Sequence, residues 1–98
     1  LVTGEFGRTP KVNGNAGRDH WSRAMCSLLA GASVQTGQVV GATDKYAAGP
    51  VDAGYSPDDL AATFFQSIGI DPKTEYQADV GRPITLVRNG NCIPGLVG

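Results

Sequence analysis

The sequence contains few of the features that usually identify a function. It has one histidine, one tryptophan and two cysteines in 98 residues, and its formal net charge is only -1. Its eight lysines and arginines are scattered, so there is no basic patch of the kind that binds nucleic acid or an anionic membrane surface. No apolar run approaches the roughly eighteen residues of a membrane span. We therefore expect neither a nucleic-acid partner nor a membrane span.

The N-terminus lacks the basic start, apolar middle and small-residue cleavage site of a secretion signal. It also lacks methionine and opens on Leu1-Val2-Thr3, which we expect to be the end of a buried strand. A hydrophobic content of 41% is typical of a globular core, and the length suits one small domain. We expect residues 1–98 to be a single partial domain, the C-terminal portion of a larger one.

Neither cysteine belongs to a recognised pattern. Cys26 and Cys92 lie far apart and form no CxxC or zinc-ribbon spacing. A disulfide would suit an exported protein, whereas the apolar run of residues 24–29 around Cys26 would suit a buried thiol. Both alternatives stay open.

The informative features are two polar clusters punctuated by glycine, TGEFGRTP at residues 3–10 and GRDHW at residues 17–21. They gather Glu, Arg, Asp and His within about twenty residues on turns, where a scaffold aims side chains at a ligand. The alternative is that these residues have structural roles only. His20 would then be a hydrogen-bonded structural residue, Glu5 a turn or helix cap, and Arg8 and Arg18 partners of nearby carboxylates.

Between and after these clusters the local patterns vary in clarity. Residues 22–32 fit a helical face or a buried strand equally in periodicity, and propensity favours the helix. Further along, a β candidate is followed by a loop, and an extended segment with an edge proline precedes an Asn89-Gly90 turn. The expected segments are a loop at 9–19, a strand at 38–43, a loop at 47–54 and the extended segment at 81–87.

The clearest expected element is a helix over residues 57–68. Ser56 is a preferred N-cap residue, Pro57 suits the first helical position, and two aspartates follow at the positive end of the helix dipole. Gly69 supplies a left-handed cap, and Pro72 prevents continuation. The apolar face, which we expect to pack on a sheet, consists of Leu60, Ala61, Phe64, Phe65 and Ile68.

Taken in order, GEFGR, GRDHW, the GATD segment, the helix ending in IGID and the closing GRPI resemble the C-terminal part of the alkaline phosphatase-like superfamily. Within it, the chain is similar to a sulfatase-related bacterial family of unknown function, DUF1501. The resemblance spans essentially the whole chain, and its most specific marks are GEFGRTP and AGRDHW. It implies an α/β fold, the C-terminal part of a sulfatase-like mixed sheet with flanking helices.

The resemblance also implies a metal site. In the metallohydrolases of that superfamily an Asp-His-Gly turn and a later loop histidine bind divalent metal. Glu5 stands where that aspartate would be and His20 matches the later histidine, but Phe6 occupies the place of the metal-binding histidine. Asp19 would orient the His20 ring or ligate the metal itself. The implied cofactor is a zinc, calcium or manganese ion.

The implied chemistry is attack on sulfur or phosphorus by a serine, threonine or modified cysteine upstream of Leu1. Arg8 or Arg18 would clamp the oxygens of the ester. Because the nucleophile is not among these residues, we expect the chain alone to be inactive.

Three interpretations follow. The first is a secreted, periplasmic or cell-envelope hydrolase of sulfate or phosphate esters, acting on a small-molecule or carbohydrate ester. The second is a non-catalytic envelope or carbohydrate-binding protein with a degenerate metal site, which Phe6 favours. The third is an independent domain in which the two clusters form an anion-binding nest without metal.

Overall fold

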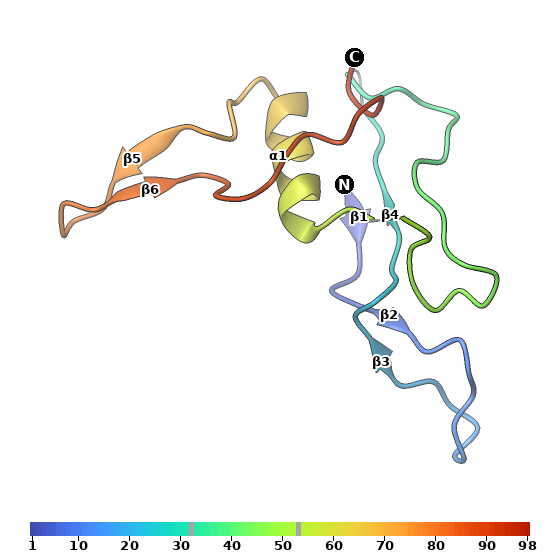
Figure 1. The fold of residues 1–98 in the computed structure, drawn as a ribbon. Coiled ribbons are helices and arrows are strands. Elements are labelled where there is room, and N and C mark those ends of the chain that lie inside the picture. Colours follow the sequence, from blue (N-terminus) through green and yellow to red (C-terminus); the bar gives the residue numbers. More distant parts are fainter. Residues whose placement is uncertain (32, 53) are drawn as a thin grey trace. The chain divides into compact units, whose positions relative to one another are not determined.

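The computed structural model describes residues 1–31, 33–52 and 54–98 (Figure 1). The chain divides into two compact units, each of which is formed by two stretches of sequence. Unit 1 comprises Leu1–Ala30 and Gly41–Gly54, and unit 2 comprises Gly31–Val40 and Tyr55–Gly98. No helix in the described part of the chain is long and apolar enough to cross a membrane. The elements in order are β1 (Val2–Thr3), β2 (Gly7–Arg8), β3 (His20–Trp21), β4 (Ser27–Leu28), α1 (Pro57–Ser67), β5 (Glu75–Gln77) and β6 (Pro83–Thr85).

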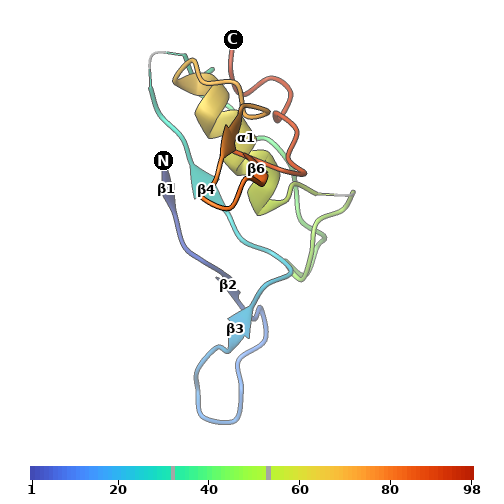
Figure 2. The same ribbon diagram turned by 90° about the vertical axis from the view of Figure 1, so that its left-hand side faces the viewer.

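Unit 1 is built on two short antiparallel strand pairs that follow one another along the same two chain segments. β1 pairs with β4, with Val2 opposite Leu28, and β2 pairs with β3, with Arg8 opposite His20. Both views show β1 and β2 running beside β4 and β3 (Figures 1 and 2). Pairing of residues 2–8 with residues 20–28, and not local structure, therefore organises this unit.

Three sequence-based expectations for residues 1–43 are wrong. Residues 22–31 contain no helix and no buried strand, because β4 hydrogen-bonds to distant β1 and leaves Leu28 62% exposed; Ala32 lies outside the described residues. Residues 38–43 form no strand, and only Thr43 makes an isolated bridge, to Pro50. The first strand does form, but Val2 is 68% exposed and is not buried.

The loop expectations are confirmed over the described residues. Residues 9–19 connect β2 to β3 without regular structure, and the 47–54 stretch, in which Ala53 lies outside the described residues, carries no strand. Asp44 organises the second loop, because its Oδ1 accepts hydrogen bonds from the N–H groups of Tyr46 and Ala48 at 3.0 and 2.9 Å.

In unit 2 the helix α1 begins and ends as its sequence predicts. The Ser56 hydroxyl accepts a hydrogen bond from the Asp59 N–H at 3.1 Å, and the Asp59 carboxylate accepts one from the Ser56 N–H at 2.8 Å, which completes a capping box. At the other end the N–H of Gly69 reaches the Gln66 carbonyl and that of Ile70 reaches the Phe65 carbonyl. With Gly69 at φ 81°, this pair of bonds is a Schellman motif.

The face that α1 buries differs from the expected one. Ala62 and Thr63 are fully buried, whereas Ile68 is 55% exposed. The helix lies against the C-terminal segment and not on a sheet: the Thr63 hydroxyl donates to the Asp59 carbonyl at 2.7 Å and accepts from the Ile93 N–H at 2.8 Å. Thr63 sits off the apolar stripe in sequence, so periodicity did not identify it. The buried apolar residues of the described chain are Ala62, Val87 and Ile93, all in unit 2.

Gly90 brings that segment close to the start of the helix. A Cβ atom at this position would lie 2.0 Å from the Asp58 carbonyl oxygen, so only glycine fits. Here Asp59 Oδ1 accepts a hydrogen bond from the Asn91 N–H at 2.8 Å, and Lys73 Nζ donates to the Gly90 carbonyl at 3.1 Å. Asp59 therefore caps the helix and anchors residues 90 and 91 to it.

The last two strands confirm the expected extended segment. β6 pairs antiparallel with β5, with Ile84 opposite Tyr76, and Pro83 lies at the first position of its strand. A proline cannot donate to a strand ladder, which agrees with its place at the beginning of an edge strand. Tyr76 and Ile84 are 52% and 41% exposed.

We expect the stability of α1 to depend on Asp59 in acid. The N–H of Asn91, followed by the N–H and hydroxyl of Ser56, holds the pKa of Asp59 below its usual value. A lowered folded-state pKa stabilises the fold above the unfolded pKa, and this contribution disappears as the pH falls through the folded value. Urea unfolding followed by circular dichroism between about pH 5 and pH 2 should show this loss in wild type and a smaller one in Asp59→Asn.

Asp58→Asn is the matched control, because Asp58 is the adjacent first-turn acid but does not bond to Asn91. An equal acid dependence of stability in wild type and Asp59→Asn would contradict the assigned role of Asp59.

Candidate functional site

The pairing of β2 with β3 brings the two polar clusters of the sequence together. Gly7 lies opposite Trp21 and Arg8 opposite His20, so residues of GEFGR and GRDHW share one strand pair. Trp21 fixes the base of this pair within unit 1, because its indole Nε1 donates to the Ala48 carbonyl at 2.8 Å. His20, which was expected on a turn, therefore lies in a short strand.

Gly7 permits this arrangement by close approach of two backbones. A Cβ atom at Gly7 would lie 1.9 Å from the Ala24 carbonyl oxygen and 3.1 Å from the Trp21 carbonyl oxygen. Every residue other than glycine would push the two chain segments apart. The glycine of the GEFGR motif is therefore a packing requirement of the strand pair.

Three side chains, those of Phe6, Arg8 and His20, are stacked beside the β2–β3 pair. The Phe6 and His20 rings have centroids 4.0 Å apart and planes inclined by 33°, and the Arg8 guanidinium carbon lies 5.7 Å from the Phe6 centroid. Arg8 also donates from Nη1 to the Arg18 carbonyl at 3.2 Å. His20 is exposed, and Phe6 is half-buried. Phe6 thus contacts both of the candidate functional residues on this strand pair.

The hairpin loop holds the other candidates by hydrogen bonds. Arg18 Nη1 donates to the Thr9 carbonyl at 2.8 Å and to the Pro10 carbonyl. Asp19 Oδ1 accepts from Asn13 Nδ2 at 2.9 Å, while Asn13 Oδ1 accepts from the Gly17 N–H at 3.0 Å. Arg18 therefore braces the loop through backbone carbonyls and not through the carboxylates that the structural interpretation expected.

The described residues do not fit a complete divalent-metal site. Glu5 lies in an exposed bend between β1 and β2, whereas Asp19 lies directly before β3, next to His20 in the chain. No three His, Cys, Asp or Glu side chains of the described residues lie close enough to hold an ion together. A zinc site needs three or four protein ligands. Any metal at His20 would require further ligands from outside these residues.

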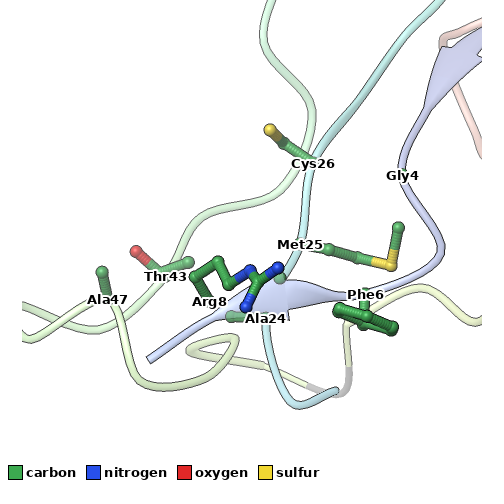
Figure 3. Close-up of a pocket in the computed structure, with 9 residues that line it drawn as sticks. Gly4, Phe6, Arg8, Ala24, Met25, Cys26, Thr43 and Ala47 are labelled. Carbon is green, nitrogen blue, oxygen red and sulfur yellow. The ribbon is translucent and has the colours of Figure 1, made fainter. Parts of the chain in front are cut away.

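An open pocket of about 480 Å³ adjoins the stack (Figure 3). It lies entirely within unit 1, between β2, the segment before β4 and the loop after Thr43. Figure 3 shows the Arg8 guanidinium and the side chains of Phe6 and Met25 around it. Sequence reasoning singled out Arg8 and Phe6 but missed the lining residues Met25, Thr43 and Ala47, because a pocket between distant segments leaves no local pattern.

The two cysteines are free thiols in the structure. Cys26 is exposed and Cys92 is half-buried, where its Sγ lies 3.8 Å from the Ala62 carbonyl oxygen. Of the two alternatives for Cys26, the structure therefore shows neither a disulfide nor a buried thiol, because its side chain is exposed and lines the open pocket.

The described residues thus form short strand pairs and one helix, and the two glycine-turn motifs meet around Phe6, Arg8 and His20. A family model described as a protein of unknown function (DUF1501) matches residues 1–97, and the chain belongs to this family. No curated protein and no solved structure gives a significant match.

We expect Gly7→Ala to disrupt the strand pair, because its methyl group would overlap the Ala24 carbonyl oxygen. Overpacking of this kind typically destabilises by about 1–3 kcal/mol. Amide hydrogen exchange of β2 and β3 should accelerate in Gly7→Ala. Gly4→Ala is the matched control, since its nearest contact, the Phe6 carbonyl oxygen, would lie at an ordinary 3.5 Å. Equal protection in both variants would show that the two backbones are not held this closely.

We expect Arg18→Ala to loosen residues 9–19, because the Thr9 and Pro10 carbonyls lose their shared donor. Hydrogen exchange across this loop should accelerate, while Lys11→Ala, which removes the same charge from the same loop, should leave it unchanged. If Arg18 instead serves as an anion clamp, sulfate affinity should fall in Arg18→Ala without any change in loop exchange. That outcome would contradict the bracing role.

Proposed function

We propose that residues 1–98 form the C-terminal part of an alkaline phosphatase-like domain, an α/β fold with a mixed sheet and flanking helices, that hydrolyses sulfate or phosphate esters. The observation that carries this proposal is the stack of Arg8, Phe6 and His20. It unites the two motifs on which the resemblance rests, and it places a fixed cation beside an imidazole, a pair suited to binding and proton transfer at an ester anion.

Exposed apolar side chains support the view that the chain is part of a larger domain. Val2 and Leu28, directly opposite each other in the β1–β4 pair, are 68% and 62% exposed. Among the described residues of unit 1, no large apolar side chain is buried. A strand pair without a core is marginally stable in water, so these residues gain most from further polypeptide packed over them. The same observation disfavours an independent anion-binding domain.

The chain's own residues have distinct roles in this proposal. Arg8 binds the oxygens of the sulfate or phosphate group through its planar fork of N–H donors. Phe6 packs on the His20 ring and limits its rotation, which leaves the ring nitrogens at the edge to exchange a proton or to ligate. Glu5 and Asp19 are the further oxygen donors near this strand pair.

A divalent zinc, calcium or manganese ion would supply the positive charge that activates a nucleophile and polarises the ester. The described residues do not bring together enough ligands to hold such an ion by themselves, and the serine, threonine or modified-cysteine nucleophile lies outside residues 1–98 in this proposal. The isolated chain should therefore be inactive. A small-molecule or carbohydrate ester is the proposed substrate, and the cell surface, periplasm or extracellular space the proposed location.

A second candidate function is a non-catalytic envelope or carbohydrate-binding protein that keeps the fold. Phe6 favours it, because the position that the resemblance assigns to a metal-binding imidazole carries an aromatic ring packed on His20. A phenyl ring offers no donor atom to a metal ion.

Metal content distinguishes the two candidates. The natural polypeptide containing residues 1–98 should carry bound divalent metal when purified without chelators, and elemental mass spectrometry should show its loss in His20→Ala. Lys11→Ala, on the same hairpin, should keep the wild-type stoichiometry. Metal retained in His20→Ala would remove His20 from the ligand set, and absence of metal from the wild type would favour the binding protein.

A further inference from the structure

The β5–β6 pair of unit 2 is a sheet of only two strands, so each strand has an outer edge (Figure 1). Among the helices and strands of the described residues, β5 and β6 contact only each other. The Ala78 N–H donates to the Arg82 carbonyl at 3.1 Å, and the Leu86 N–H donates to the Thr74 carbonyl at 2.9 Å. Since hydrogen-bonded positions alternate along an antiparallel pair, the two residues that flank Tyr76 direct their backbone groups away from β6.

The outer edge of β5 is open, whereas that of β6 is closed. The outward positions of β5 are Glu75 and Gln77, and all three residues of this strand are exposed. On β6 the outward positions are Pro83 and Thr85, which lie opposite Gln77 and Glu75. Because proline has no N–H, the edge of β6 lacks a donor that a further strand would need. Another strand can therefore add to β5 but not to β6.

We propose that the outer edge of β5 pairs with the same edge of a second copy of the chain, in a two-fold dimer with a continuous four-stranded sheet. Antiparallel pairing about Tyr76 sets Glu75 opposite Gln77 of the second copy, and Gln77 opposite its Glu75. Both pairs are then hydrogen-bonded positions, so every outward backbone group of β5 finds a partner. This surface lies in unit 2 and is independent of the site proposed for ester hydrolysis, which lies in unit 1.

Charge selects this register over its neighbours. A shift of two residues in one direction would set Glu75 opposite Glu75 of the second copy, and a shift in the other direction would set it opposite Asp79. Directly opposed like charges destabilise a strand pair. Pairing about Tyr76 instead places the Glu75 carboxylate beside the Gln77 side-chain amide, which can donate a hydrogen bond to it. The edge is therefore complementary to itself in one register.

Tyr76 supplies the apolar part of this interface. Ile84 lies opposite Tyr76 on β6, and both side chains are exposed. Directly opposed residues share one face of a sheet, so the dimer aligns Ile84 and Tyr76 of both copies in one apolar row. The two central tyrosines occupy a non-hydrogen-bonded pair, in which side chains approach most closely. Each tyrosine thereby covers apolar surface of the other that is exposed in the single chain.

Sedimentation equilibrium and amide hydrogen exchange of the natural polypeptide containing residues 1–98 test this pairing. Two strands of three residues make a small interface, so we expect a weak dimer that forms as the concentration rises toward about 100 μM or more. Exchange of the Glu75 and Gln77 amides should slow over the same range. A monomer at every concentration, or exchange of these two amides that is independent of concentration, would overturn the inference, the latter because another segment or partner would then cover the edge or leave it free.

A charge swap tests the register. Gln77→Glu opposes two acids at both symmetry-related places and should weaken dimerisation about threefold to thirtyfold. The double variant Glu75→Gln with Gln77→Glu restores an acid–amide pair at each place and should dimerise like wild type. Val80→Glu adds the same charge at an exposed position between β5 and β6, outside the paired residues, and should change dimerisation little.

All three positions are exposed, so these substitutions should leave the fold intact, which circular dichroism checks. A double variant as weak as Gln77→Glu would contradict pairing about Tyr76. An equal loss in Val80→Glu would assign the effect to net charge and would overturn the inference as well.

Discussion

The close approach of the Gly7 backbone to the Ala24 carbonyl is the constraint on which unit 1 depends. A Cβ atom at Gly7 would fall 1.9 Å from that oxygen, so the absence of a side chain lets residues 1–8 run beside residues 20–28. This pairing sets Arg8 opposite His20 and packs Phe6 on the imidazole ring. Because unit 1 buries no large apolar side chain among its described residues, backbone pairing and side-chain stacking carry most of its order.

Unit 2 is ordered by a small core and by polar side chains that each bond to two chain segments. The fully buried Thr63 hydroxyl connects α1 to the Ile93 N–H, and the Asp59 carboxylate connects the helix cap to the Asn91 N–H. Each side chain satisfies backbone groups of two segments at once, and a buried polar group is tolerated only when it is bonded in this way. Helix capping and tertiary packing in unit 2 are therefore one interaction.

The proposed chemistry depends on how Phe6 is understood. Its ring removes a donor from the position where the resemblance expects a metal-binding histidine, yet it holds His20 and Arg8 in place by stacking. A hydrolase would use this ring to position the two polar side chains, and a binding protein would use it as part of a ligand surface. The pocket beside it combines one cation, Arg8, with the apolar side chains of Phe6 and Met25.

The sequence by itself determined the local features. These are the two ends of α1 at Ser56 and Gly69, the loop at residues 9–19, the edge position of Pro83, and the choice of GEFGR and GRDHW as candidate site motifs. These depend on interactions within a few residues, which composition and spacing record directly. Tertiary structure alone decided that residues 22–31 are extended, that Thr63 is buried, and that Phe6, Met25 and Thr43 line one pocket. Those outcomes depend on partners about twenty or more residues away, and the pairing energy of such partners overrides local propensity without leaving a periodic trace in the sequence.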